Sequence, residues 1–151
     1  MRKFHIFTDL DGTLLGKEDY RYEANVQLIS DLKLKGIGVS LNTSKTLSET
    51  ECWQYKLGLD SPFIIENGAA ILFPKNKFEL EQLKPHKVES RGRYFCIVLG
   101  MKIDLLEDLY RPYAEKVTSL IHCPRNEAES LTGLGGSDLQ RARMREFSLP
   151  L

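Results

Sequence analysis

The first half of the chain alternates between short apolar runs and segments of helical character. Apolar runs at residues 4–7, 37–41 and 62–66 have the length of strands buried on both faces. Between them lie residues 24–35, where apolar positions recur every three or four residues, and residues 46–57, which open with the capping-box pattern Thr-Leu-Ser-Glu. This order of strand, helix and strand predicts an α/β fold with a parallel sheet.

The second half of the chain is less regular. Asn67-Gly68 predicts a turn into a further strand at residues 69–73, which would complete a β-hairpin. Residues 74–89 are rich in Lys, Glu, Pro and His with little periodicity, and we interpret them as a linker. A second unit is predicted after the linker, with three elements: a strand at 93–100, a helix at 103–113 that Pro112 kinks or ends, and a basic helix that opens with a capping-box pattern at Ser137 and carries Arg141, Arg143 and Arg145.

The composition is that of one globular domain. The chain has 151 residues, of which 42% are hydrophobic, and this is enough for a buried core. Its 21 basic and 21 acidic residues balance, so we predict no nucleic-acid partner and no membrane-surface partner. Three cysteines without a C-x-x-C pair, and no apolar stretch of membrane-spanning length, indicate a cytoplasmic protein.

Two carboxylates directly follow the first predicted strand. In an extended segment residues two apart point the same way, so Asp9 and Asp11 can face one crevice, and Gly12 lets the chain turn away. Open parallel sheets bind ligands at this carboxyl edge. Two adjacent carboxylates need a counter-charge, and Mg²⁺, a hard cation with oxygen ligands, supplies it and attracts phosphate. Such a pair can transfer phosphoryl groups, with one carboxylate as nucleophile and the other as proton donor and acceptor.

These polar segments also have simpler interpretations. A D-x-D-G run occurs in ordinary turns after strands and in calcium loops, but a calcium loop that begins at Asp9 needs Glu where Tyr20 stands. The run Thr43-Ser44-Lys45 after the second strand can hold a phosphate through hydroxyls and amides, or it can simply cap the next helix. Asn67 is at least as well explained by a tight turn as by substrate contact.

Three segments together resemble one enzyme family. Asp9-Leu10-Asp11-Gly12-Thr13 resembles the D-x-D-G-T signature of the haloacid dehalogenase-like phosphohydrolases. Asn42-Thr43-Ser44-Lys45 and Glu66-Asn67-Gly68-Ala69 narrow the resemblance to the mannosyl-3-phosphoglycerate phosphatase branch. The resemblance implies that Asp9 is the nucleophile and Asp11 the general acid and base, and that both lie at a Mg²⁺ site. It further implies that phosphate and substrate are bound by Gly12, Thr13, Thr43, Ser44, Lys45 and Asn67.

A fourth segment extends the resemblance into the second unit. Residues 142–150 match an A-x-x-R-E-x-S-x-P pattern in the cap of the same branch. This implies that Arg145 and Ser148 lie toward the substrate, where Arg145 pairs with a glycerate carboxylate. Leu149 stands where that branch commonly has Glu. From the residues alone, the basic run is a solvated helix face.

The resemblance implies a fold and an activity. Residues 1–74 would form the N-terminal part of a Rossmann-like core, with about three parallel strands and a hairpin, and residues 75–151 an inserted α+β cap. The activity would be Mg²⁺-dependent hydrolysis of a phosphomonoester, with a small phosphorylated sugar and glycerate compound, mannosyl-3-phosphoglycerate, as substrate and mannosylglycerate as product.

The family places two further motifs after the cap. These are a lysine that steadies the aspartyl-phosphate and a G-D-x-x-x-D acidic pair that completes the metal site, and neither follows before Leu151. We therefore expect the front portion of a longer phosphatase, with an exposed sheet flank that favours self-association. Two alternatives stay open: a phosphotransferase or phosphomutase with the same intermediate, and a non-catalytic fragment that binds a sugar phosphate or a partner chain.

Overall fold

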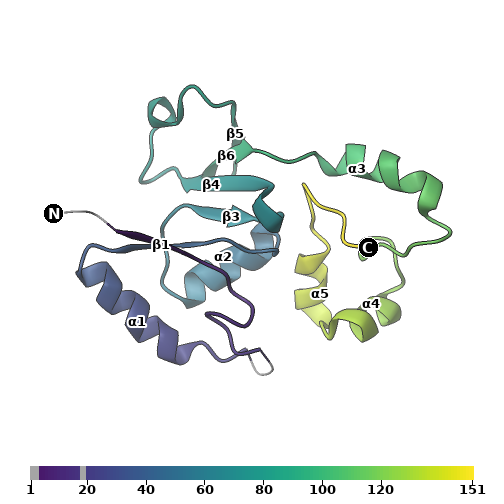
Figure 1. The fold of residues 1–151 in the computed structure, drawn as a ribbon, viewed down its shortest axis with the longest axis horizontal. Coiled ribbons are helices and arrows are strands. Elements are labelled where there is room, and N and C mark those ends of the chain that lie inside the picture. Colours follow the sequence, from purple (N-terminus) through teal and green to yellow (C-terminus); the bar gives the residue numbers. More distant parts are fainter. Residues whose placement is uncertain (1–3, 18–19) are drawn as a thin grey trace.

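The computed structural model of the protein describes residues 4–17 and 20–151. Along this part of the chain the elements follow one another as shown in Figure 1. In chain order they are β1 (His5–Thr8), α1 (Glu23–Leu34), β2 (Gly38–Leu41), α2 (Leu47–Lys56), β3 (Phe63–Ile65), the 3₁₀ turn η1 (Glu66–Gly68), β4 (Ala70–Pro74), η2 (Leu80–Leu83), β5 (Val88–Arg91), β6 (Tyr94–Val98), α3 (Ile103–Tyr110), η3 (Arg111–Tyr113), α4 (Arg125–Thr132) and α5 (Gly136–Ala142).

The predicted parallel arrangement is confirmed at the start of the chain. β1 and β2 pair in parallel along their whole length, and α1 makes the crossover between them (Figure 1). β3 joins β2 through one parallel bridge, between Asn42 and Ile64. The Ser40 hydroxyl also donates a hydrogen bond of 2.5 Å to the Pro62 carbonyl. The ends of β1, β2 and β3 therefore lie at one edge, where the polar segments follow.

β3 also begins a second sheet, which has the strand order β3-β4-β6-β5 and antiparallel neighbours throughout. The predicted hairpin is confirmed, because Ile65 pairs with Ala70 across the loop of residues 66–69. The proposed boundary after residue 74 falls within this sheet, since β6 pairs with the full length of β4. The division into residues 1–74 and 75–151 stays a prediction.

Two local predictions are wrong. Residues 74–89 are not an unstructured linker, because Leu83 is only 6% exposed and anchors η2, and β5 begins at Val88 to pair with β6. The capping box at Ser137 does not form, because the N-cap of α5 is Gly135, two residues earlier, and no side chain caps the helix. Ser137 and Asp138 lie inside the first turn, where both bind Arg141. Helix α4 was not predicted.

The main hydrophobic core gathers side chains from the turn after β1, from α1, β2 and the end of α2, and from β3, β4 and β6. Its largest fully buried apolar members are Leu10, Leu15, Leu41, Leu57, Phe63, Ile65 and Leu72. The predicted first strand is the exception, because Phe4, just before β1, is 65% exposed and Phe7, within β1, is 63% exposed. The expectation that this strand is buried on both faces is wrong, because among the described residues only β2 pairs with it and no helix covers these two rings.

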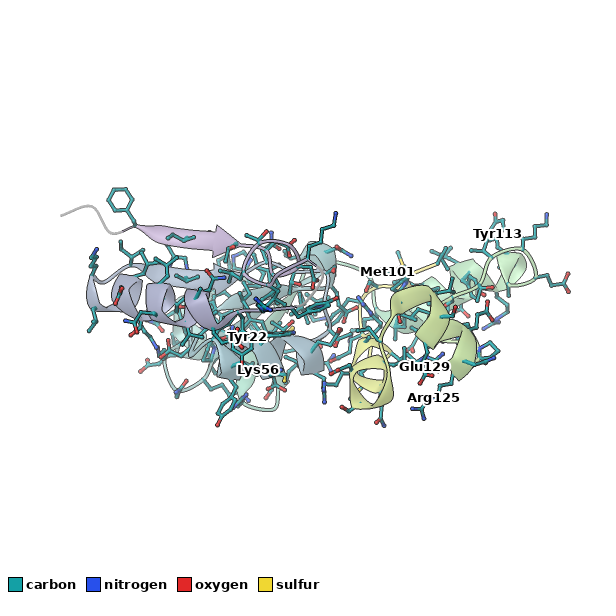
Figure 2. The ribbon with its side chains drawn as sticks, turned by 90° about the horizontal axis from the view of Figure 1, so that it is seen from below. Tyr22, Lys56, Met101, Tyr113, Arg125 and Glu129 are labelled. Carbon is teal, nitrogen blue, oxygen red and sulfur yellow. The ribbon has the colours of Figure 1, made fainter. Side chains whose placement is uncertain are left out.

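Helices α3, α4 and α5 form a second group, on the opposite side of the molecule from α1 (Figures 1 and 2). This group has its own small buried cluster of Cys123, Ala128 and Leu139. Arg125 and Glu129 form an ion pair of 2.8 Å on the outer face of α4 (Figure 2). Among the described residues, no helix combines the length and the hydrophobicity that crossing a bilayer requires.

Candidate active site

The two predicted catalytic carboxylates lie at the carboxyl end of β1 and reach solvent. Asp9 is exposed, and its Oδ1 accepts a hydrogen bond of 2.7 Å from the Leu10 amide. Leu10 is fully buried, so its side chain anchors the turn that follows the strand. Gly12 has φ of +70°, a left-handed conformation that a side chain would strain. The turn thus presents Asp9 and Asp11 at the surface, as a metal or substrate site requires.

Asp11 is paired with a lysine from the next loop. Lys45 Nζ lies 3.0 Å from Asp11 Oδ1, and the lysine side chain is only 11% exposed. The sequence predicts Lys45 beside the substrate, and the structure places its ammonium against the carboxylate to which we assign acid and base chemistry. Because the pair is partly shielded from water, the lysine offsets part of the negative charge of the two carboxylates.

The loop of residues 42–45 lies beside the end of β1. The Asn42 amide donates to the Thr8 carbonyl at 2.8 Å, and the Thr43 amide donates to the Ile64 carbonyl at 3.1 Å. The Lys45 amide donates to the Thr43 hydroxyl oxygen at 3.2 Å. These three amides are therefore occupied within the protein, and phosphate binding by the backbone of this loop stays a prediction.

Several side chains of this loop and of the turn after Asp11 were predicted to bind phosphate or substrate. Ser44 is exposed, and Lys45 carries its charge toward Asp11. Thr43 is only 2% exposed, and its hydroxyl oxygen already accepts a hydrogen bond from the Lys45 amide. Thr13 is exposed on the turn after Asp11. The binding roles of these residues and of Gly12 stay predictions.

Asn67 has the geometry of a turn residue. Its φ of 60° and ψ of 36° are left-handed, and its amide donates to the Thr43 carbonyl at 3.1 Å. The Glu66 amide donates to the Lys45 carbonyl at 3.0 Å. The loop after β3 is therefore joined by its backbone to the loop after β2. Asn67 is exposed beside this junction, so the turn is observed and its substrate contact stays a prediction.

Glu66 is a central residue of this region that the sequence interpretation missed. Its carboxylate is 1% exposed and accepts hydrogen bonds from the Glu146 and Phe147 amides, each at 3.0 Å. The Ser148 hydroxyl donates to the same carboxylate at 2.6 Å. One signal in the sequence could have found it, because an acidic residue at the end of an apolar run, before Asn-Gly, must have partners if it is buried.

Arg145 contacts the loop of residues 42–45, and its predicted contact with the substrate stays a prediction. Its Nη1 donates to the Ser44 carbonyl at 2.7 Å and to the Ser148 hydroxyl oxygen at 3.2 Å. Its Nε donates to the Ala142 carbonyl at 2.9 Å. α5 has ended at Ala142, so Arg145 is not on the helical charged face that the basic run suggested. The structure brings it and Ser148 beside Ser44, across more than 100 residues of sequence.

α5 itself is attached to the start of α2. The predicted capping box is confirmed, with Thr46 accepting from the Glu49 amide and Glu49 accepting from the Thr46 amide. The Thr46 hydroxyl also lies 2.9 Å from the Arg141 carbonyl, to which it donates. A residue that caps one helix thus holds the end of another, and this contact fixes the second group of helices beside the candidate site.

The chain matches one protein family over most of its length. The profile of the haloacid dehalogenase-like hydrolases matches residues 6–97. A glucosyl-3-phosphoglycerate/mannosyl-3-phosphoglycerate phosphatase of Persephonella marina is 36% identical over 149 residues, which cover 96% of this chain and 53% of the relative. A mannosyl-3-phosphoglycerate phosphatase of Pyrococcus furiosus is 35% identical over 147 residues, 95% of this chain and 57% of the relative. The chain thus spans about half the length of the curated relatives it matches.

Solved structures agree on the fold. A hypothetical protein from Geobacillus kaustophilus superimposes with a TM-score of 0.53 at 20% identity, over 76% of this chain and 37% of that one. A haloacid dehalogenase-like hydrolase from B. subtilis gives a TM-score of 0.51 at 18% identity, over 92% of this chain and 49% of that one. At such identities the likeness concerns the fold alone, and it confirms a mixed α/β core of this type.

Proposed function

Because this chain belongs to the haloacid dehalogenase-like hydrolase family, we propose that it takes part in Mg²⁺-dependent hydrolysis of a phosphomonoester, with mannosyl-3-phosphoglycerate as substrate. The observation that carries the proposal is the pair of exposed carboxylates, Asp9 and Asp11, at the carboxyl end of β1. The relatives named for this reaction match 95–96% of the chain, including this turn.

In this proposal the two carboxylates divide the chemistry. Asp9 Oδ1 is oriented by the Leu10 amide, which leaves Oδ2 to attack phosphorus and form an aspartyl-phosphate while the bond to the leaving oxygen breaks. Asp11 gives a proton to that oxygen. It then takes a proton from the water that attacks the aspartyl-phosphate, which releases inorganic phosphate and restores Asp9. Lys45, 3.0 Å from Asp11, holds Asp11 in place between the two steps.

The donor set suits Mg²⁺. This ion is usually held by one or two carboxylates and keeps several waters, with substrate phosphate oxygens completing its shell. Asp9 and Asp11 supply the carboxylates, and no group of three or more His, Cys, Asp or Glu side chains gathers at this site or elsewhere among residues 4–17 and 20–151, so waters and substrate would have to supply the other ligands. When bound, the ion supplies positive charge that offsets the repulsion between carboxylates and phosphate.

A second candidate function is substrate binding without turnover by this chain alone. It is supported by the coverage of the relatives, since only 53–57% of their length is matched. Hydrolysis would then need groups from the part of those relatives that this chain does not match. A phosphatase differs from a phosphotransferase in the acceptor of the phosphoryl group, which is water in the phosphatase and a second sugar in the phosphotransferase.

Phosphate release from mannosyl-3-phosphoglycerate tests the proposal. It should be measured for this chain alone and for this chain joined to the unmatched part of the Persephonella marina relative. In whichever form is active, Asp9→Asn should abolish release, because an amide is a far poorer nucleophile. Asp104→Asn, at an exposed position of α3, is the matched control and should retain full activity. Comparable release by the Asp9→Asn variant and the parent would refute the mechanism.

A further inference from the structure

A cavity of about 320 Å³ lies beside the pair of Asp11 and Lys45. One wall is a face of α2 that carries Trp53 and Lys56, and the opposite wall is the loop of residues 133–135 with the start of α5. The volume falls within the roughly 300–1,000 Å³ of small-molecule sites. Of the predicted site residues, Lys45 alone lines the cavity.

Lys45 connects this cavity with the proton-transfer residue. Its ammonium lies 3.0 Å from Asp11 Oδ1 and 5.9 Å from the centre of the Tyr20 ring, which also lines the cavity. A ligand that touches Lys45 from the cavity is therefore one side chain away from Asp11. Because we assign to Asp11 the proton that goes to the leaving oxygen, a leaving group held in this cavity would lie one side chain away from its proton donor.

The cavity lining offers an aromatic ring and an available cation. Lys56 is exposed, and its ammonium lies 4.4 Å from the centre of the Trp53 ring. The acidic residues of the lining already have partners, since Glu49 accepts from Thr46 and Asp138 binds Arg141. An aromatic wall with a few placed polar groups suits a hydroxylated ligand, and an ammonium suits its carboxylate.

Arg145 is less available for that carboxylate than the family pattern implied. Its Nε and Nη1 already donate to the Ala142 and Ser44 carbonyls and to the Ser148 hydroxyl. A carboxylate that pairs with two nitrogens of the guanidinium would have to displace one of these bonds, whereas Nη2 alone could bind without displacement. Lys56 holds its charge over a ring at the surface and needs no such exchange.

We propose that this cavity binds the glycosylglycerate part of the phosphomonoester, with Lys56 at its carboxylate and Trp53 beside its sugar. The inference rests on the proposed function and names the residues that select its leaving group. The leaving group would thus be selected by α2 and the loop before α5, in addition to residues 145–148.

Gly135 gives a way to close the cavity. It lines the wall opposite α2 and has an extended backbone, with φ of −131° and ψ of 171°. A Cβ built on it meets nothing within 4 Å, so Gly135→Leu adds volume there without backbone strain. Ser130→Leu is the matched control, because Ser130 is exposed on α4 and outside the lining.

The emission of Trp53 reports on the cavity, because it is the single tryptophan of the chain. Titration with mannosylglycerate should give a saturable change in emission. Gly135→Leu and Lys56→Gln should each raise the dissociation constant about tenfold or more, the effect of losing space or one charge-assisted contact. Ser130→Leu should bind like the parent, and inorganic phosphate alone should leave the emission unchanged.

Two results would overturn the inference: no saturable change with mannosylglycerate, or unchanged binding by both cavity variants. If circular dichroism shows that Gly135→Leu is unfolded, the surface variant Lys56→Gln decides. The titration needs no turnover, so it separates the two proposals. Hydrolysis with no response of Trp53 to mannosylglycerate would overturn the cavity alone, whereas binding without hydrolysis by any form would overturn the proposed reaction alone.

Discussion

Replacing Glu66 by alanine should destabilise this protein more than any change to a surface ion pair. The carboxylate is 1% exposed and accepts from two amides and one hydroxyl of residues 146–148. Its removal leaves three donors without an acceptor in the space between the β3-β4 hairpin and the C-terminal segment. That segment should then lose its attachment to the core.

The magnitude follows from the three donors. A buried donor left unpaired costs roughly 1–3 kcal/mol, so three of them set an upper limit of about 9 kcal/mol. Water entering the gap and the relief of carboxylate desolvation reduce this sum, and truncating one partner of a buried charged network costs about 3–5 kcal/mol. We therefore expect Glu66→Ala to lower the free energy of unfolding by about 3–5 kcal/mol. Glu66→Gln, which keeps one acceptor oxygen, should lose roughly half of that.

Urea unfolding followed by Trp53 emission and by circular dichroism measures the effect. Glu129→Ala is the control, because Glu129 makes a single exposed ion pair with Arg125 (Figure 2), and such pairs contribute about 0.3–0.5 kcal/mol. A loss for Glu66→Ala as small as that of the control would show that the three hydrogen bonds do not hold the segment, and the reasoning would be refuted.

Three further predictions concern the metal, the pH dependence and the sheet flank. Exhaustive chelation should abolish phosphate release from any active form and Mg²⁺ should restore it, because the carboxylates otherwise repel the phosphate; full activity after chelation would contradict this. Burial tends to raise the pKa of Asp60, but Lys77 and Lys33, at 2.5 and 3.1 Å, hold the pKa below its ordinary value of 3.8. The stabilisation by Asp60 should thus be present above about pH 4 and disappear as pH falls through the lowered pKa. The urea midpoints of unfolding of the parent and of Asp60→Asn should therefore differ at neutral pH and become equal in acid. The exposed rings of Phe4 and Phe7 should cause self-association that increases with protein concentration, measured as mass by light scattering. Phe7→Ser should reduce this association. Equal masses of parent and variant at all concentrations would count against an association through β1.

Short-range patterns in the sequence determined much of the fold. The apolar runs and the helical spacing placed β1, α1, β2, α2 and β3 within one or two residues, because each depends on neighbours in the chain. The capping box of Thr46 and Glu49 and the hairpin after Asn67 are equally local, since their hydrogen bonds join residues a few positions apart. The Asp9 and Asp11 pair follows from these elements, because a parallel strand that ends there leaves both carboxylates at the edge of the sheet.

Tertiary structure alone decided which distant groups meet. Three contacts join segments that lie 34 to 101 positions apart in the chain: Lys45 with Asp11, Arg145 with Ser44, and Glu66 with residues 146–148. No periodicity or cap encodes such contacts, because they depend on how the second group of helices docks against α2 and the β3-β4 hairpin. The exposure of β1 likewise depends on what covers it, which an apolar run does not reveal. The turn chemistry of this candidate site is therefore local, whereas its charge partners and the cavity beside it exist only because the chain folds back on itself.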